Sequence, residues 1–264
     1  MKDVFYEASK DNNRRVFTEV QTTSHSRPHF HRAIEIAYIT EGTAHYSIEG
    51  ECFAVEADQI VFSYAYYTHS SYNYTPYRQY VIAVPNNFSK DIIRLFKDSV
   101  LPAVLTDKSF NKELKPYFEN MMNITDNTPE IIIKGYINLI FGLLAEHYHN
   151  EALKPKHKNI ILIAEILDYI DLHFEEAISL GDIAEHFGYN KSYFSRFFNK
   201  YVGISLNDYI NGLRLDRYEE LSKLYPDKSV TDLVFSSGFQ SLATFYRVRD
   251  FRQKSRELAE HPKV

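Results

Sequence analysis

Between residues 22 and 85 the chain alternates apolar and polar positions with a period of two. The segment Ala33–Thr40 is rich in β-branched and aromatic residues, and residues 41–42 (Glu-Gly) can turn the chain. His45–Ile48 alternates before a second turn at Glu49–Glu51. Residues of these types favour strands, and short strands that recur about every ten residues are typical of a small antiparallel barrel or sandwich. We therefore expect a sheet-rich first half.

A helical pattern begins near Ser89. Ile92, Ile93 and Phe96 form one short amphipathic face, and Pro129 suits the first turn of a helix that runs to about His149. This second helix is apolar around most of its circumference. It therefore needs burial on two sides, against the sheet or against another subunit.

A polar segment that contains Pro155 separates this first half from a second, entirely helical pattern. We place a first domain at residues 1–150, a linker at 151–158 and a second domain at 159–264. Residues 1–155 carry 15 basic and 19 acidic side chains, a net charge of −4, and residues 156–264 carry 15 and 16, a net charge of −1. Total charge therefore does not indicate a nucleic-acid-binding protein.

Charge in the second half is nevertheless clustered. Residues 188–206 hold three basic and no acidic side chains, and residues 247–256 hold five basic against one acidic, a net charge of +4. Positive charge gathered on one face matters more for phosphate binding than the total of a domain. These clusters are candidate contacts to a nucleic acid.

The second half also repeats itself. SLGDIAEHFGY at residues 179–189 corresponds to SVTDLVFSSGF at 229–239, and YFSR at 193–196 corresponds to TFYR at 244–247. In each copy a serine can cap a helix, with an acid three residues later, and a glycine can end that helix in the left-handed conformation. A helix, a turn with glycine and a second helix form the helix-turn-helix motif, whose second helix enters the DNA major groove. Helical patterns at 160–174 and 206–224 would support the first unit and separate the two.

Residues 160–252 resemble the double helix-turn-helix domain of the AraC/XylS family of transcription regulators. The stretches SLGDIAEHFGYNKSYFSRFFNKYVGIS, YINGLRL and SVTDLVFSSGF…TFYRV carry the resemblance. It implies sequence-specific binding to a double-stranded operator and control of transcription, with RNA polymerase as a further candidate partner. The family usually continues after Val248 with Phe-Lys and a Gly-x-x-Pro turn, and it prefers alanine where Tyr218 and Val234 stand. These departures predict a bulkier second unit with a weaker C-terminal brace.

Periodicity along the second helix of each unit separates buried from DNA-facing positions. Apolar positions on one face are expected inside the unit, namely Phe194, Phe197, Phe198, Phe245 and Val248. The arginines of the opposite face can donate two parallel hydrogen bonds to guanine, and its lysines suit phosphates. The predicted DNA contacts are Lys191, Ser192, Ser195, Arg196, Asn199, Lys200, Leu242, Ala243, Tyr246 and Arg247.

In the first half, His29-x-His31-x-x-x-Glu35, with His69 downstream, resembles the paired motifs of cupin barrels. In that family three histidines and the glutamate bind one divalent metal, and such a donor set suits Zn, Fe, Mn or Ni. On one continuous strand His29, His31 and Glu35 would share parity and point into one cavity. AraC-type sensor domains are cupin-like and commonly use the cavity for a small effector without metal.

Three interpretations of this motif stay open: a metal site formed by the three histidines and Glu35, a metal-free effector pocket, and a structural role. The effector pocket requires no cofactor and would be lined by His29, His31, Glu35, Tyr46 and His69, and filling it would bias the arrangement of the two domains. Tyrosine is dense in this region and can stack on a sugar ring, which favours a carbohydrate effector. The tyrosines concerned are Tyr38, Tyr46, Tyr64, Tyr66, Tyr67, Tyr72, Tyr74, Tyr77 and Tyr80.

The expected fold class is α+β, with an N-terminal cupin-like β-barrel, accessory helices and a C-terminal all-α double helix-turn-helix domain. The sequence has no paired catalytic carboxylates, nucleophile elbow or phosphate-binding glycine loop, so we expect no enzymatic activity. A metal-dependent cupin enzyme tethered to a DNA-binding domain is the alternative. One cysteine, Cys52, and no apolar run of about 20 residues predict a cytoplasmic protein that is not embedded in a membrane.

The family resemblance further suggests a homodimer built through the first domain. The apolar helix at 129–149 is the expected core of that interface. Its expected seam comprises Ile132, Ile133, Ile137, Ile140 and Leu144.

Overall fold

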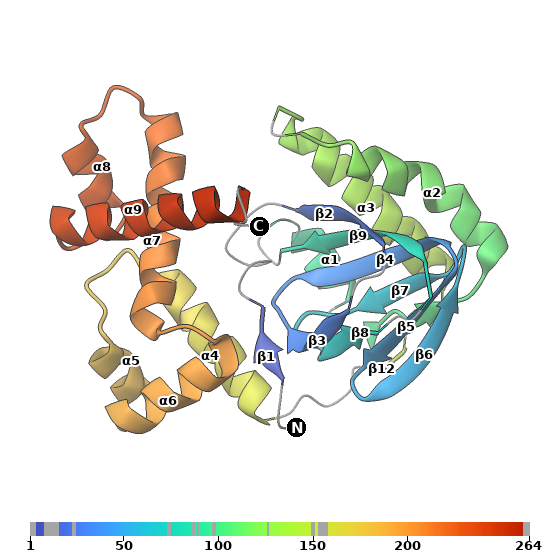
Figure 1. Ribbon diagram of the computed structural model, residues 1–264, viewed down its shortest axis with the longest axis horizontal. Coiled ribbons are helices and arrows are strands. Elements are labelled where there is room, and N and C mark those ends of the chain that lie inside the picture. Colours follow the sequence, from blue (N-terminus) through green and yellow to red (C-terminus); the bar gives the residue numbers. More distant parts are fainter. Residues whose placement is uncertain are drawn as a thin grey trace. The chain divides into compact units, whose positions relative to one another are not determined.

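The computed structural model describes residues 4–7, 16–22, 25–72, 75–85, 88, 90–96, 99–125, 127–148, 151–152 and 158–260. The chain divides into two compact units, Met1–His157 and Lys158–Val264. The first unit combines sheets and helices and the second is helical, which confirms the expected α+β class (Figure 1). Of the predicted linker, residues 151–152 form a strand and Lys158 begins a helix, while 153–157 lie outside the described residues.

Two five-stranded sheets form the first unit. Their orders are β1-β3-β8-β5-β6 and β11-β7-β4-β9-β2, and β10 pairs separately with β12. The strands are β1 (Phe5–Tyr6), β2 (Phe17–Thr22), β3 (Ser26–Phe30), β4 (Ile34–Glu41), β5 (Thr43–Ile48), β6 (Glu51–Glu56), β7 (Ile60–Ser63), β8 (His69–Ser71), β9 (Arg78–Val84), β10 (Ser99–Val100), β11 (Val104–Leu105) and β12 (Glu151–Ala152).

Side chains from both sheets form one core between them. Ala37 and Ile39 of β4, Tyr46 and Ile48 of β5 and Val61 of β7 belong to the same buried cluster. Alternation with a period of two places these residues on the inner faces. Among the described strands the two sheets share no ladder, so the expected barrel is an open sandwich whose edge strands include β6 and β11. The Gly42 turn, with φ of 74°, could not carry a side chain, because a Cβ there would lie 2.6 Å from the Pro76 carbonyl oxygen.

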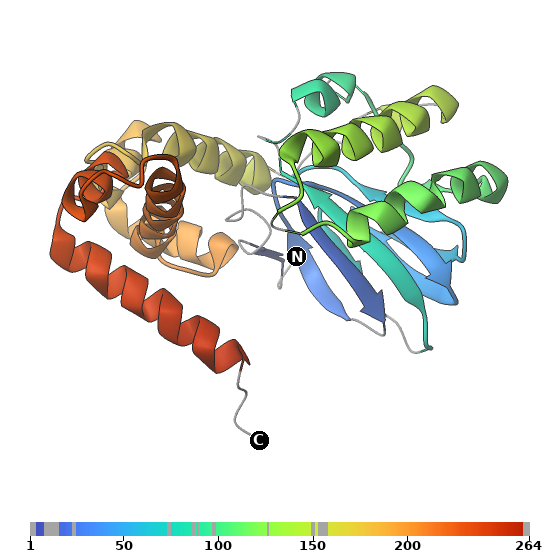
Figure 2. The ribbon, with the colours of Figure 1, turned by 90° about the horizontal axis from the view of Figure 1, so that it is seen from above.

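Helices cover one face of the second sheet (Figures 1 and 2). Tyr38 of β4 packs against Phe118 with ring centroids 5.3 Å apart, and Phe62 of β7 packs against Phe141 at 6.5 Å. The helices of this unit are α1 (Lys90–Leu95), α2 (Lys108–Met122) and α3 (Glu130–His147). The short amphipathic face is confirmed at Ile92 and Phe96, which are buried.

The predicted dimer seam on α3 is wrong for three of its five residues. Ile137, Ile140 and Leu144 are buried inside their own unit, because they are the stripe with which α3 packs on the sheet. Ile132 is exposed and Ile133 is half-buried. The outward face of the helix carries other apolar side chains, Ile131 and Leu139, which are 79% and 42% exposed.

The second unit contains two helix-turn-helix motifs joined by a long helix (Figure 1). Ser179 caps the first motif in a capping box with Asp182, and Ser229 accepts from the Asp232 amide in the second. The turns pass through Gly188 at φ 74° and Gly238 at φ 94°, as the repeat predicted. The helices are α4 (Lys158–His173), α5 (Leu180–His186), α6 (Lys191–Val202), α7 (Leu206–Leu224), α8 (Val230–Ser236) and α9 (Leu242–Glu260).

The bulky residues of the second motif pack into its core. Val234 is buried with Phe239 and Phe245, and the Tyr218 ring lies 4.5 Å from that of Phe245. The helix α9 continues to residue 260. Arg252, near the middle of α9, pairs with the Asp216 carboxylate of α7 and donates to the Gly212 carbonyl at 3.1 Å. A charged contact thus holds α9 against α7 where the family pattern has a Gly-x-x-Pro turn. The side chains of residues 254–260, which include the predicted basic Lys254 and Arg256, lie outside the description.

Candidate nucleic-acid interface and histidine cluster

The second helix of the first motif, α6, presents its predicted DNA face to solvent. Its four apolar buried positions, Phe194, Phe197, Phe198 and Val202, set the inward side. Ser195 is half-buried, and the remaining predicted contacts are exposed, namely Lys191, Ser192, Arg196, Asn199 and Lys200.

Local contacts fix the start of this face. Asn190 caps α6 by accepting from the Tyr193 amide at 2.9 Å. Hydrogen bonds with Ser179 hold the pKa of Asp182 below its ordinary value, and the positive charge of Lys191 acts in the same direction. Lys191, at the start of this face, therefore lies near the ionised carboxylate of Asp182. Arg196 lies more than one helical turn further along α6.

The second motif presents a smaller face on α9. Ala243, Tyr246 and Arg247 are exposed. Leu242, a predicted DNA contact, is half-buried and packs on the core of the motif, so it supports the face.

One residue of this face belongs to the predicted basic cluster at 247–256 but was not among the individually predicted DNA contacts. Arg249 is exposed, its guanidinium lies 4.8 Å from the Tyr246 ring, and it pairs with Asp250 at 3.2 Å. A spacing of three residues places Arg249 on the same side of α9 as Tyr246, and this i, i+3 relation could have identified it.

The two motifs meet at a buried arginine. Arg214 of α7 is 7% exposed, and it donates to the carbonyl oxygens of Phe174 at 2.7 Å and Glu176 at 2.8 Å, between α4 and α5. Burial lowers the pKa of this guanidinium from its ordinary value. Arg214 also lines a cleft of about 260 Å³, which includes Gln240, Thr244 and Arg247 of the second motif. The long helix therefore fixes both motifs to one frame.

The first unit brings the three predicted histidines together. His29, His31 and His69 are almost fully buried, and their ligand nitrogens all lie within 4.8 Å of one another. Each Nδ1 faces a main-chain carbonyl oxygen, at 2.7 Å for His29, 3.0 Å for His31 and 2.9 Å for His69. A carbonyl only accepts, so each Nδ1 carries a proton and each Nε2 is left to face the centre of the cluster.

A carboxylate closes the cluster. Glu35 lies 3.3 Å from Nε2 of His31 and 3.8 Å from Nε2 of His69, and Glu7 lies 3.1 Å from Nε2 of His29. A carboxylate oxygen and an unprotonated imidazole nitrogen are both acceptors, and they do not attract one another. The contacts become favourable when a positive charge, on the imidazoles or on a bound cation, lies among them.

The expected continuous strand from His29 to Glu35 is wrong. His29 lies on β3 of one sheet and Glu35 on β4 of the other, and the chain crosses between the sheets at residues 31–33. The side chains of His29 and Glu35 still converge, because the odd-numbered residues of both strands face the interior of the sandwich at this point.

The interior beside this cluster is filled. The space among Glu35, Tyr46, Val61, Ser63 and His69 admits no water-sized sphere, so the predicted effector cavity has no room for a sugar in this structure. The Tyr46 hydroxyl donates to Gln79 at 2.8 Å. The pKa of Tyr46 is raised mainly by burial and, to a smaller extent, by the negative charge of Glu35. Five of the nine tyrosines are buried, Tyr38, Tyr46, Tyr66, Tyr67 and Tyr77, and Tyr74 lies outside the described residues.

Comparisons with known proteins match both units. A family model described as an AraC-like ligand binding domain matches residues 14–129, and one described as a helix-turn-helix domain matches residues 183–257. Among the described residues, no helix is long and apolar enough to cross a membrane.

Individual relatives are distant. The chain is 21% identical to the melibiose operon regulatory protein of Escherichia coli K12, over 83% of this chain and 78% of that protein. It is 27% identical to an uncharacterised helix-turn-helix transcription regulator of Staphylococcus aureus strain COL, over 45% of this chain and only 15% of that protein's length. Among solved structures it is similar to ToxT from Vibrio cholerae bound to an unsaturated fatty acid, with a TM-score of 0.41, 14% identity and coverage of 88% and 90%.

Proposed function

Because the chain belongs to the AraC family of regulators, we propose that it is a cytoplasmic regulator that binds a specific double-stranded DNA operator through both motifs of its second unit and responds to a signal received by its first unit. The observation that carries the proposal is the pair of exposed helix faces on one rigid frame. Arg196 and Arg247 are exposed at corresponding positions of the repeat. Arginine in the major groove is the usual reader of guanine.

The length of the connecting helix α7 suits simultaneous contact of both motifs with one DNA duplex. The 19 residues of α7 correspond to about 28 Å at 1.5 Å per residue. One turn of B-DNA measures about 34 Å, and paired reading helices enter major grooves one turn apart. The frame is of the size that would set α6 and α9 in successive grooves on one side of a duplex.

Enrichment of duplexes from a random pool tests this proposal. The full chain should select one motif with two conserved elements, and binding to it should exceed binding to unselected duplex by at least about a thousandfold. Equal binding to selected and unselected duplexes would mean that the protein does not read sequence.

We further propose that the histidine cluster holds a divalent transition metal. Three imidazoles and a carboxylate are a common donor set for such ions. Each imidazole is oriented by a main-chain carbonyl at its other nitrogen, as metal-binding histidines usually are. A bound cation would replace the unfavourable acceptor–acceptor contacts around Glu35, and the ion would join β3, β4 and β8 across the two sheets.

Metal analysis of protein purified without chelator tests the site. We expect about one metal ion per chain, its loss in the His31→Ala variant, and its retention in His25→Ala, because His25 is exposed and is not part of the cluster. Absence of metal in the parent protein and equal thermal stability before and after metal addition would refute the site. The filled interior leaves no place for a substrate beside the cluster, which favours a structural or sensing role over a cupin enzyme.

A further inference from the structure

The cleft between the two helix-turn-helix motifs has two polar walls. It measures about 260 Å³ and lies within the second unit. One wall is formed by Asn207, Asn211 and Arg214, whose spacings of four and three residues place them on one side of α7. The other wall lies at the start of α9 and is formed by Gln240, Thr244 and Arg247. The cleft is therefore bounded by the helix that joins the motifs and by the DNA-facing helix of the second motif.

The exposure of these side chains increases from the floor of the cleft to its mouth. Arg214 is 7% exposed and lies deepest. Asn211 and Thr244 are half-buried above it, one on each wall. The three remaining polar side chains are exposed at the mouth, namely Asn207, Gln240 and Arg247. A group that enters the cleft therefore meets polar atoms at every depth and a buried guanidinium at the end.

Several hydrogen-bond donors of the cleft are not used by the described residues. Arg214 donates through Nε and Nη2 to main-chain carbonyl oxygens, and within the described part of the chain its Nη1 has no protein partner. The Thr244 hydroxyl accepts from the Ser241 hydroxyl at 3.0 Å, so its own hydrogen stays available to an acceptor. The side-chain amide of Asn211 likewise donates to no oxygen among the described residues. These donors suit a ligand with several acceptor oxygens.

The charges of the cleft favour an anion. Both arginines of the cleft are without an ion pair within the described part of the chain. The nearest acids in the sequence have partners of their own: Asp208 accepts from the Ser205 hydroxyl at 2.6 Å, and Glu176 lies 2.9 Å from Nδ1 of His173. Guanidinium, amide and hydroxyl donors are the usual contacts of phosphate oxygens in protein–DNA complexes. A phosphate group fits this donor set.

DNA bound by both motifs brings a phosphate to this position. When two helices enter successive major grooves, the minor groove and the two backbones that flank it face the region between them. The cleft lies in that region, because its walls belong to α7 and to the start of α9. We propose that the cleft binds one backbone phosphate of the operator, with Arg214 facing its charge and with Asn211 and Thr244 donating to its oxygens. This inference rests on the proposed DNA-binding function.

A phosphate in the cleft fixes both motifs on the duplex at once. Phosphate contacts carry no sequence information, but they set the position and orientation of a protein on DNA. Arg214 belongs to the helix that joins the motifs, and Thr244 belongs to the DNA-facing helix of the second motif. One phosphate bound to both residues therefore sets where each DNA-facing helix meets its bases.

Duplexes with one neutral linkage locate the phosphate. In each duplex a methylphosphonate replaces a single phosphate of the selected motif, and fluorescence anisotropy measures the affinity of the full chain. We expect one linkage between the two conserved elements at which the neutral group weakens binding at least about tenfold. If every linkage between the elements can be neutralised without such a loss, the proposal is wrong.

Variants assign that linkage to the cleft. Asn211→Asp keeps the size of the side chain and places a carboxylate beside the phosphate, so it should weaken binding of the native duplex at least about tenfold. The neutral linkage should then bind this variant at least as tightly as the native phosphate does, because the repulsion is gone. An Asn211→Asp variant with the parent's full preference for the native phosphate refutes the site.

Two further variants complete the comparison. Thr244→Val removes only the hydroxyl, and it should weaken binding of the native duplex about threefold or more and reduce the effect of the neutral linkage. Leu172→Asp is the control for charge, because Leu172 is 79% exposed on α4 and does not line the cleft. It should show the parent's pattern at the sensitive linkage. A Leu172→Asp variant that reproduces the pattern of Asn211→Asp contradicts the assignment to the cleft.

Inorganic phosphate tests a free anion as the occupant. At constant ionic strength, millimolar phosphate in place of chloride should raise the melting temperature of the parent no more than that of Asn211→Asp. A rise that Asn211→Asp abolishes, together with no sensitive linkage in the duplex, assigns the cleft to a free phosphorylated ligand and overturns the DNA contact. A chain that reads its motif without a sensitive linkage fails only this inference, whereas a chain that selects no motif fails the proposed function and this inference together.

Discussion

Gly238 packs backbone to backbone on Glu175: a Cβ at position 238 would lie 2.6 Å from the Glu175 Cα and 2.7 Å from the Phe174 carbonyl oxygen. The turn of the second helix-turn-helix motif thus rests directly on the segment that opens the first. The same Phe174 carbonyl accepts from Arg214. These contacts make the two motifs one rigid frame, and that frame decides the distance between their exposed helices.

Gly238→Ala should destabilise the second unit more than Gly188→Ala does. Both positions have positive φ, which costs a residue with a Cβ about 1–2 kcal/mol. Position 188 has open space for a Cβ, whereas at 238 the added atom collides with main chain and costs about 1–3 kcal/mol more. Urea unfolding followed by circular dichroism measures both free energies. Equal losses would show that the Gly238 contact does not constrain the frame.

Arg214→Ala should also weaken the frame, by about 2–4 kcal/mol, because it removes the guanidinium that donates to the carbonyl oxygens of Phe174 and Glu176 and leaves a space in the core where the side chain was buried. Arg217→Ala on the same helix is the control. Arg217 pairs with Glu175 and Glu220 nearer the surface, so its loss should cost less than about 1 kcal/mol. The reverse order of the two free energies of unfolding would contradict the role assigned to Arg214.

The homodimer stays a proposal, and we now propose that its seam lies on the outward face of α3, where Ile131, Ile132 and Leu139 are exposed. Leu139→Glu should convert a dimer to a monomer at unchanged thermal stability of the unit, since Leu139 is exposed. Leu144→Glu should unfold the unit instead, because Leu144 is fully buried. Light scattering and thermal denaturation separate the two effects. A Leu139→Glu variant that remains dimeric would exclude this face.

A Lys200 variant can separate the contribution of phosphate contacts to DNA affinity from the recognition of base sequence. The Lys200 ammonium is exposed near the end of α6 and lies 5.5 Å from the Tyr201 ring. Lys200→Ala should weaken binding to selected and unselected duplexes alike and lower the slope of log affinity against log salt by about 0.9. An unchanged salt slope would remove Lys200 from the interface.

Much of the second unit could be predicted because its signals are local. Each signal acts within one or two helical turns: a serine cap, an acid three residues later and a glycine at the turn. All three signals occur in both copies of the repeat. Ser179 and Gly188 illustrate this, since both have the predicted role. The repeat could not show that Leu242 packs inward, because that depends on the core formed with α7 and α8.

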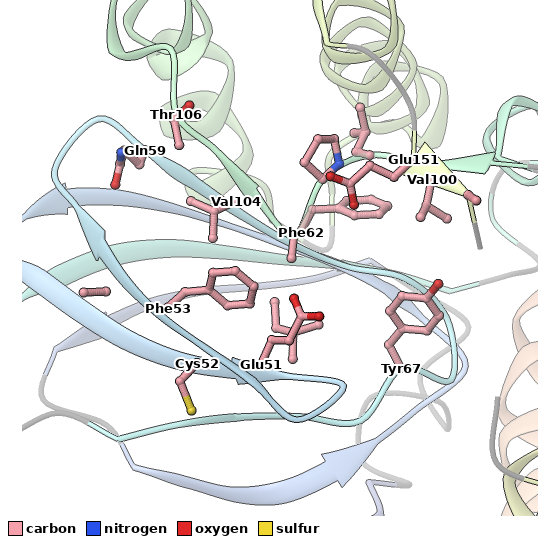
Figure 3. A pocket seen from close by; sticks show the side chains of 16 residues that line it. Glu51, Cys52, Phe53, Gln59, Phe62, Tyr67, Val100, Val104, Thr106 and Glu151 are labelled. Carbon is pink, nitrogen blue, oxygen red and sulfur yellow. The ribbon is translucent and has the colours of Figure 1, made fainter. Parts of the chain in front are cut away.

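The first unit was less predictable, since its site depends on contacts between sheets. The histidine motif was found from spacing alone, but the crossing at residues 31–33 depends on how β3 and β4 pair with different partners. The apolar stripe of α3 was equally ambiguous: Leu144 and Leu139 are both leucines in one apolar helix, and only the position of the sheet decides which is buried. A cavity of about 470 Å³ between β6 and β11 (Figure 3) had no sequence signal, because its lining residues are spread along the chain from Ile48 to Ala152.

The most direct test of DNA reading by both motifs is duplex selection with the parent chain and with Arg196→Ala and Arg247→Ala. Each arginine should read one base pair, worth about 1–3 kcal/mol, in a different element of the selected motif. We predict that Arg196→Ala relaxes the preference at one position of the first element and Arg247→Ala at one position of the second, with the other element unchanged in each case. Identical motifs from all three proteins, or no enriched motif from the parent, would contradict the account.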